Sequence, residues 1–128
     1  MQVKDVVKDF GELVGIQSLE INENGVLHVT IHNIGDLFID EKYSFESGDH
    51  VFVYLLRVYE HVDGMLYGRA LKLCDYERGR KFTINPVLHG DNALGFAIKW
   101  PIDSFNINIL REMIDVLKTL QDRLEGGI

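Results

Sequence analysis

Residues 51–56, with the sequence VFVYLL, are apolar or aromatic at every position. Side chains of a strand alternate between two faces, so both faces of this strand are apolar and both require a cover. A helical pattern follows over residues 63–76, and it contains Gly64 and Gly68. A glycine inside a helix costs roughly 1 kcal/mol relative to alanine. A fold for this chain must therefore cover both faces of the strand and account for two glycines in a helix.

The glycine-containing segment has two apolar faces on a helical wheel. The first face is suited to packing on a sheet and consists of Leu66, Ala70, Leu73 and Cys74. The neighbouring face consists of Gly64, Tyr67, Gly68 and Leu71. Close approach of another backbone would explain the glycines, and a symmetric dimer would place the same helix of a second copy there. The alternative is that Gly64 lies in the first turn, where it costs little, and that Gly68 is tolerated.

Periodicity and turn signals predict the other elements. Before the apolar strand they indicate a helix over residues 2–15, a short strand over 18–22, an Asn24-Gly25 hairpin turn, and strands over 27–32 and 36–42. The apolar strand itself spans 50–59. After the glycine helix, which Asp63 can cap, strands are predicted over 80–88 and 93–100, and Pro101 ends the sheet. Asp103 or Ser104 then caps a long last helix that stops at Gly126 and Gly127.

The predicted order is α-β-β-β-α-β-β-α, which is typical of an α+β fold with an antiparallel sheet flanked by helices. The chain has 128 residues, enough for a single domain over 1–128. The last helix is expected to present a broad apolar face built from two adjoining stripes: Ile109, Met113, Val116 and Leu120, and Leu110, Ile114, Leu117 and Leu124.

Charge and cysteine content narrow the classes of function. The net charge of −7 argues against nucleic acid and against an anionic membrane surface as the main partner. Cys74 is the single cysteine, so no intrachain disulfide or cysteine metal cluster can form, and a reducing compartment is expected. The first residues carry acids where a signal peptide needs an apolar run, and the longest strongly apolar run is far shorter than the ~20 residues of a membrane span. We expect a soluble cytoplasmic protein without membrane insertion.

Residues that could carry chemistry are few. His28 and His32 would lie about 13 Å apart on a strand, too far to share one metal ion. Cys74 falls on the core side of its helix, where a small apolar role is expected. Acidic residues at 36, 40 and 41 are typical of charge beside an edge strand. The sequence has no nucleophile elbow or phosphate-binding glycine loop. We therefore predict no catalytic, cofactor-binding or metal-binding residue, and no enzyme.

A protein-binding surface remains. Apolar side chains of the first helix and the first three strands could form exposed patches: Val7, Leu13, Val14, Phe38, Phe52 and Tyr54. Large exposed apolar patches mark interaction sites. Taken singly, each of these side chains fits a place in the core better than one on the surface.

The pattern resembles the class I (CesT-like) chaperones of bacterial type III secretion. The resemblance runs from Val3 to Leu124 and rests on the stretches FGELVGI, NGVLHVTI, HVFVYLLRV, GMLYGRALKLC and ALGFAIKWP, and on the long amphipathic helix after Pro101. Members often have Leu-Leu, a small residue and Asn near the end of the middle helix, where this chain has Leu-Lys-Leu-Cys-Asp at residues 71–75.

The resemblance implies a homodimer formed largely through the middle helix, in the bacterial cytoplasm, with no catalysis and no nucleotide. The ligand would be the N-terminal region of a secreted effector, held in extended form and kept competent for secretion. The secretion ATPase would be a further partner. A heterodimer with a second chaperone-like protein is also found in the family.

Two other functions stay open. A toxin-neutralising or regulatory binding module would use a preformed surface against a folded partner, and its acidity would complement a basic target. A small enzyme would use His28 and His32.

Overall fold

The computed structural model describes residues 3–15, 25–42, 49–76 and 81–126. Its elements are α1 (Val3–Val14), β1 (Val26–Ile31), β2 (Gly35–Lys42), β3 (His50–Val58), α2 (Gly64–Tyr76), β4 (Ile84–His89), β5 (Ala93–Pro101), a 3-10 turn (Ile102–Ser104) and α3 (Ile107–Gly126). The predicted order of helices and strands and the α+β class are confirmed. The strand predicted over 18–22 lies outside the described residues.

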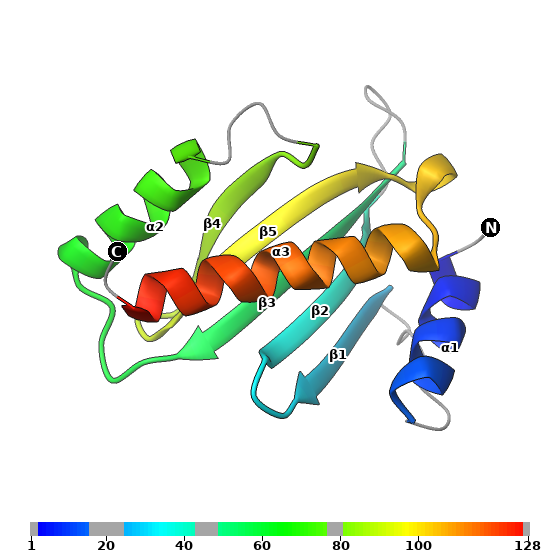
Figure 1. Ribbon diagram of the computed structural model, residues 1–128, viewed down its shortest axis with the longest axis horizontal. Coiled ribbons are helices and arrows are strands. Elements are labelled where there is room, and N and C mark those ends of the chain that lie inside the picture. The colour runs from blue at the N-terminus through cyan, green and yellow to red at the C-terminus, as the bar shows by residue number, and fades with distance from the viewer. Residues whose placement is uncertain (1–2, 16–24, 43–48, 77–80, 127–128) are drawn as a thin grey trace.

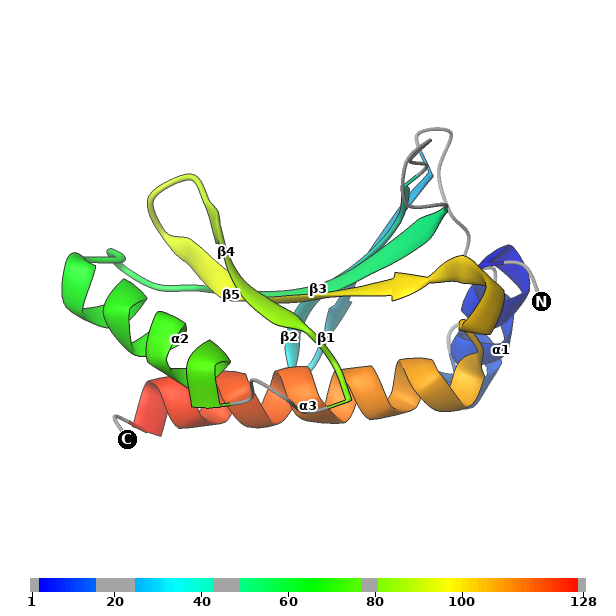
Figure 2. The same ribbon diagram turned by 90° about the horizontal axis from the view of Figure 1, so that it is seen from above.

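The strands form one antiparallel sheet in the order β1-β2-β3-β5-β4. All three helices lie on one face of this sheet, with α3 running across it (Figure 1). Seen from above, the two sides of the sheet curve away from the helices, and none of the described helices lies on the concave face (Figure 2). We call this the open face. The apolar strand β3 is at the centre of the sheet, so one of its faces is covered and the other is part of the open face.

The core lies between the sheet and the helices. From β3 it takes Val51, Val53 and Leu55, each with no exposed surface. Side chains of α3 fill the space above them and are almost completely buried: Leu110, Met113, Leu117, Leu120 and Leu124. Both predicted stripes of the last helix therefore contribute to the core, and only Ile109 and Val116 of the first stripe are half-buried at its margin.

The start of α3 differs from the prediction. Neither Asp103 nor Ser104 caps the helix, because both belong to the 3-10 turn. Asn106 is the cap: its side-chain oxygen accepts a hydrogen bond from the Ile109 N–H at 2.9 Å. Two other predicted boundaries are confirmed, whereas the strand predicted over 80–88 is β4 and begins only at Ile84. The Asp63 carboxylate accepts a hydrogen bond from the Leu66 N–H at 2.8 Å, and β5 ends at Pro101.

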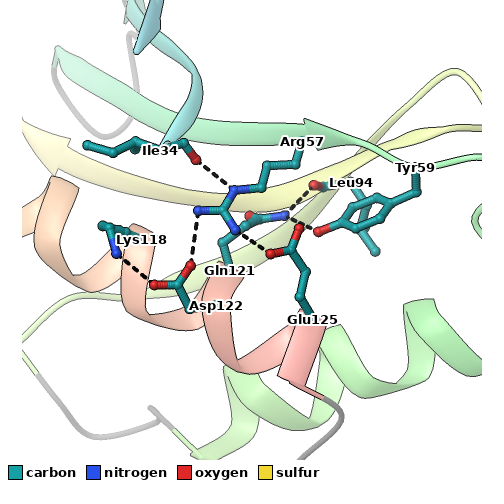
Figure 3. Close-up of polar contacts among 8 residues, drawn as sticks. All are labelled: Ile34, Arg57, Tyr59, Leu94, Lys118, Gln121, Asp122 and Glu125. Carbon is teal, nitrogen blue, oxygen red and sulfur yellow. Dashed lines mark hydrogen bonds and ion pairs between the residues drawn. The ribbon is translucent and has the colours of Figure 1, made fainter. Parts of the chain in front are cut away.

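Polar contacts dock the end of α3 against the sheet (Figure 3). The half-buried Arg57 donates from Nε to the Ile34 carbonyl oxygen at 2.7 Å and pairs with Asp122 and Glu125 of α3. The fully buried Gln121 donates to the Tyr59 hydroxyl at 2.8 Å and to the Leu94 carbonyl oxygen at 2.9 Å. Hydrogen bonds between polar groups in a low-dielectric interior favour one arrangement of the elements that carry them. The contacts of Arg57 thereby tie the β1–β2 turn and the end of α3 to β3.

Gly95 marks a very close approach of β5 to β3. A Cβ atom at this position would overlap the carbonyl oxygen of Leu55, which lies on the paired strand. Only glycine lets two backbones come this close. Gly95 is therefore a requirement of the sheet geometry.

Candidate protein-binding face

Three rings form a stacked row across the open face. The strand register places His28 opposite Phe38, and Phe38 opposite Tyr54. The His28 and Phe38 ring centroids are 4.3 Å apart and those of Phe38 and Tyr54 are 4.7 Å apart, with nearly parallel planes in both pairs. No described element covers these rings, and His28 retains 52% of its side-chain exposure. The row is a mainly apolar strip that crosses β1, β2 and β3.

A hollow of about 450 Å³ adjoins this row. Its apolar lining comes from Phe52, Tyr54, Val87 and Ala97, and its polar lining from Asp40, His50 and Lys99. The register aligns Asp40, Phe52 and Lys99 across three neighbouring strands. The aromatic ring of Phe52 is thus flanked by a carboxylate on β2 and an ammonium group on β5.

The hollow is partly shielded from solvent, and this shielding affects the pKa of Tyr54. Burial raises the pKa of the Tyr54 phenol, and the nearby charge of Asp40 raises it further. The phenol therefore stays protonated at neutral pH and can donate a hydrogen bond. Asp40 is itself a buried carboxylate, with an exposed fraction of only 7%.

Asp36 lies beside the row, at the start of β2 and next to the turn that joins β1 and β2. The Thr30 hydroxyl donates to its carboxylate at 2.7 Å, and His28 Nε2 lies 3.3 Å from the same oxygen. The hydrogen bond from Thr30 lowers the pKa of Asp36; burial opposes this effect, while His28 adds to it. Because the pKa of Asp36 is lower in the folded chain than in the unfolded chain, its ionised carboxylate stabilises the fold at pH values above the unfolded-state pKa. This stabilisation is lost as the pH falls through the folded-state pKa.

Replacing Thr30 by valine is expected to raise the pKa of Asp36, because the largest cause of its lowering is removed. Carbon-detected NMR titration of the Asp36 carboxyl measures the shift directly. The stability of the variant should also fall less than that of the wild type when the pH drops below about 4. An unchanged Asp36 titration would contradict the assigned role of the Thr30 hydroxyl.

The six predicted binding residues fall into three groups. Phe38, Phe52 and Tyr54 come together on the open face, each of them half-buried. Leu13 and Val14 are exposed near the end of α1, with exposed fractions of 55% and 42%. Val7 is completely buried in the core, so its side chain is not part of any surface.

Sequence reasoning missed His28, Asp40 and Lys99 as parts of this face. Strand alternation places His28 on the face opposite to Leu27, but only the register shows that it stacks on Phe38. Asp40 was interpreted as charge beside an edge strand, whereas β2 is an inner strand of the sheet. No sequence motif around Lys99 indicates a role in binding.

The predicted interface face of α2 is largely open to solvent. Gly64 and Leu71 are exposed, whereas Tyr67 and Gly68 are half-buried. A Cβ atom at either glycine would meet no atom within 4 Å. Packing among the residues that the structure describes therefore does not explain the two glycines.

The described residues offer no cluster for a metal ion and no reactive thiol. Among them, no three histidine, cysteine or acidic side chains lie together in a ligand arrangement. Burial raises the pKa of the Cys74 thiol to about 11, and the neighbouring Asp75 contributes, so little thiolate is present at neutral pH. None of the described helices combines the length and apolar character that crossing a membrane requires.

Comparison with solved structures places the fold. The chain superposes with a TM-score of 0.65 on a chain of the HopA1–SchA chaperone–effector complex, at 14% identity, covering 96% of this chain and 90% of that one. The TM-score is 0.68 for a chain of the ExsC–ExsE complex, at 9% identity and with coverage of 98% and 92%. It is 0.58 for a chain of the Yersinia pestis type III secretion chaperone SycH in complex with a stable fragment of YscM2, at 20% identity and with coverage of 96% and 97%.

These similarities confirm the predicted resemblance at the level of the fold. The α+β arrangement of this chain is that of type III secretion chaperone–effector complexes, over nearly the full length of each chain. Sequence comparison gives no further assignment, since no protein-family model and no curated protein sequence matches the chain.

Proposed function

We propose that this chain is a type III secretion chaperone that binds the N-terminal region of a secreted effector and keeps it soluble and competent for secretion. The observation that supports this most directly is an uncovered sheet face with stacked aromatic rings, in a fold shared with chaperone–effector complexes. In this proposal the protein acts by binding, in the cytoplasm of a bacterium, without a cofactor.

The open face is suited to apolar side chains of a partner. Aromatic side chains dominate interface energetics because they bury large areas and lose little conformational entropy. Stacking already holds the rings of Phe38 and Tyr54 in place, so these two side chains lose little conformational freedom on binding, and the sheet register places Phe52 beside them. When a partner covers these rings, their exposed apolar surface is removed from water, and this stabilises the complex.

An extended partner segment would add to the sheet at β1 rather than at β4. The Tyr59 N–H bonds to the Asn92 carbonyl oxygen at 2.7 Å, which sets the alternation of hydrogen-bonded pairs along β5. By that alternation the backbone of Pro86 faces the free edge of β4. Proline has no N–H, so this edge lacks a donor at its centre. The strand β1 contains no proline, so none of its positions lacks the backbone N–H group that strand addition requires.

The exposed face of α2 supports the proposed homodimer. Gly64 and Gly68 leave open space in which a second helix can approach closely. Leu71 is 45% exposed beside them and would be buried by such a contact. A second copy of the chain would thereby account for both the glycines and the exposed leucine.

Gly68→Leu is expected to convert the proposed dimer into a monomer, because the larger side chain fills the space that the second helix needs. Light scattering coupled to size-exclusion chromatography measures the mass. Thr119→Leu, at an exposed position of α3, is the matched control and should leave the dimer intact. A Gly68→Leu protein that stays dimeric would show that this interface is wrong.

The function is tested by isolating the partner. The protein is tagged at its C-terminus, expressed in its native host under conditions of active secretion, and purified with whatever binds in stoichiometric amount. The proposal expects one larger protein, held through its N-terminal region of about 100 residues, with protease-sensitive stretches between contacts. A compact, protease-resistant partner would favour a toxin-neutralising or regulatory module. Recovery of the protein alone would count against the proposal.

A further inference from the structure

We propose that Arg57 is a positioning residue for the partner: it holds the end of β1 in place, so that the outer edge of this strand can pair with an extended partner segment. This inference rests on the proposed function and adds to it a residue on the helix-covered side of the sheet, where Arg57 contacts α3. Arg57 acts through the turn that joins β1 and β2.

The hydrogen-bond pattern of the sheet defines the outer edge of β1. The Glu41 N–H bonds to the Gly25 carbonyl oxygen at 3.0 Å, so bonded pairs of residues alternate along β1 and β2 from this position. By this alternation Val29 bonds to β2, whereas the backbone groups of His28 and Thr30 point to the side of β1 away from β2. A segment that adds to the sheet at β1 would pair with these two residues, close to the β1–β2 turn.

Two consecutive hydrogen bonds connect Arg57 with the end of β1, and Figure 3 shows the first of them. Arg57 Nε donates to the Ile34 carbonyl oxygen at 2.7 Å, and the Ile34 N–H donates to the Ile31 carbonyl oxygen at 3.0 Å. Ile31 is the last residue of β1. The backbone of Ile34 is therefore bonded on one side to β3 and on the other to β1, so the position of Arg57 affects the position of the strand end.

The turn itself has a backbone that depends on such contacts. Asn33 has a φ of 66° and Gly35 a φ of 135°. Positive φ is unfavourable for most residues other than glycine and persists where the surrounding structure holds it. Gly35 lies directly on β3, since a Cβ atom there would be 2.8 Å from the Leu56 carbonyl oxygen and 3.1 Å from Arg57 Cγ. Contacts with β3 therefore support the conformation of the turn.

Two carboxylates of α3 orient the Arg57 guanidinium. One terminal nitrogen lies 3.1 Å from Asp122 Oδ1, and the other pairs with Glu125. The donors of a guanidinium have a fixed planar arrangement, so pairing of both terminal nitrogens leaves Nε directed at the turn. In lysine a methylene group takes the place of Nε. A lysine at this position can keep the ion pairs but cannot reproduce the hydrogen bond to the turn.

Hydrogen exchange measured by NMR tests the hold on β1 without any partner. Arg57→Lys should speed the exchange of the Val29 and Leu37 amides, which bond β1 to β2, about tenfold or more. The Leu55 and Phe96 amides, which bond β3 to β5, should stay within about threefold of the wild type. Equal changes at both pairs of amides, or no change at either, would overturn the proposal.

Lys118→Met is the matched control for this experiment. Lys118 pairs with Asp122 at 2.7 Å, so its replacement removes a positive charge from the same polar group and keeps the bond between Arg57 and the turn. An exposed ion pair of this kind contributes little to stability. Exchange of the Val29 and Leu37 amides should stay within about twofold, and an acceleration equal to that of Arg57→Lys would overturn the proposal.

A second experiment measures the pairing with β1 itself. The probe is the extended segment of the N-terminal region recovered from the host, prepared with its normal backbone and with single N-methylated amides, which cannot donate a hydrogen bond to a strand edge. The wild type should prefer the normal backbone at one or more positions. Arg57→Lys should reduce this preference about three- to tenfold. A general loss of stability would lower both affinities alike and leave their ratio unchanged.

The two experiments separate this inference from the proposed function. A recovered partner whose preference for the normal backbone is absent in the wild type, or is unchanged in Arg57→Lys, would remove the role of Arg57 and leave the chaperone proposal standing. Local release of β1 in Arg57→Lys, in a protein that recovers no partner from its host, would count against the chaperone proposal and support the hold of Arg57 on β1.

Discussion

Gly95→Ala is expected to lower the free energy of unfolding by at least about 3 kcal/mol. The added methyl group would overlap the Leu55 carbonyl oxygen and press on the Leu55 carbonyl carbon. Both atoms belong to the backbone of the central strand β3, so no side chain can rotate away, and β3 and β5 must separate. That loss is a large fraction of the about 5 to 15 kcal/mol that holds a domain folded. Urea denaturation followed by circular dichroism measures it.

Gly126→Ala is the matched control for this variant. Gly126 is the last residue of α3, and a Cβ atom there would meet nothing within 4 Å. Its stability should stay within about 0.5 kcal/mol of the wild type. Equal urea midpoints for Gly95→Ala and Gly126→Ala would contradict the close approach of the two strands.

The double variant Phe52→Ala, Tyr54→Ala is expected to lose at least about 30-fold in affinity for the partner recovered from the host. Both rings line the hollow, and Tyr54 also belongs to the stacked row. Truncating a central aromatic side chain of an interface commonly costs about 2 kcal/mol or more. Calorimetry with the N-terminal region of the partner gives the affinity.

Leu88→Ala removes a comparable exposed apolar side chain outside the hollow and is the control. It should retain wild-type affinity. Thermal unfolding of the free variants separates a loss of binding from a loss of fold. Wild-type affinity in the folded double variant would show that the partner does not use this face.

Local signals predicted most of the elements, and their one error at a helix start has a tertiary cause. Asp103 and Ser104 both have the chemistry of a helix cap, as does Asn106. The choice depends on Phe105, which is buried and lies in extended backbone between the 3-10 turn and α3. Placing this ring in the core delays the helix, and no local pattern contains that requirement.

The candidate site was predictable in part. Aromatic residues on the first strands predicted a patch, and the glycines of the middle helix predicted a second apolar face, on which the described residues leave Gly64 and Leu71 exposed. Val7, in contrast, has the same amphipathic setting as Leu13 and Val14 but is completely buried. Helical periodicity defines an apolar face of α1; how much of that face the rest of the chain covers depends on where the helix is docked.

The sequence by itself determined the order of helices and strands, the acidity of the chain and the double-faced apolar character of β3. Only the tertiary structure decided which face of β3 is covered. Both faces are apolar, so the residue pattern of β3 does not tell which of them the helices cover. In the structure all three helices lie on one face of the sheet, and Val51, Val53 and Leu55 are the side chains of β3 that are buried there. That arrangement leaves Phe52 and Tyr54 on the open face, and the strand register then places Asp40 and Lys99 on either side of Phe52.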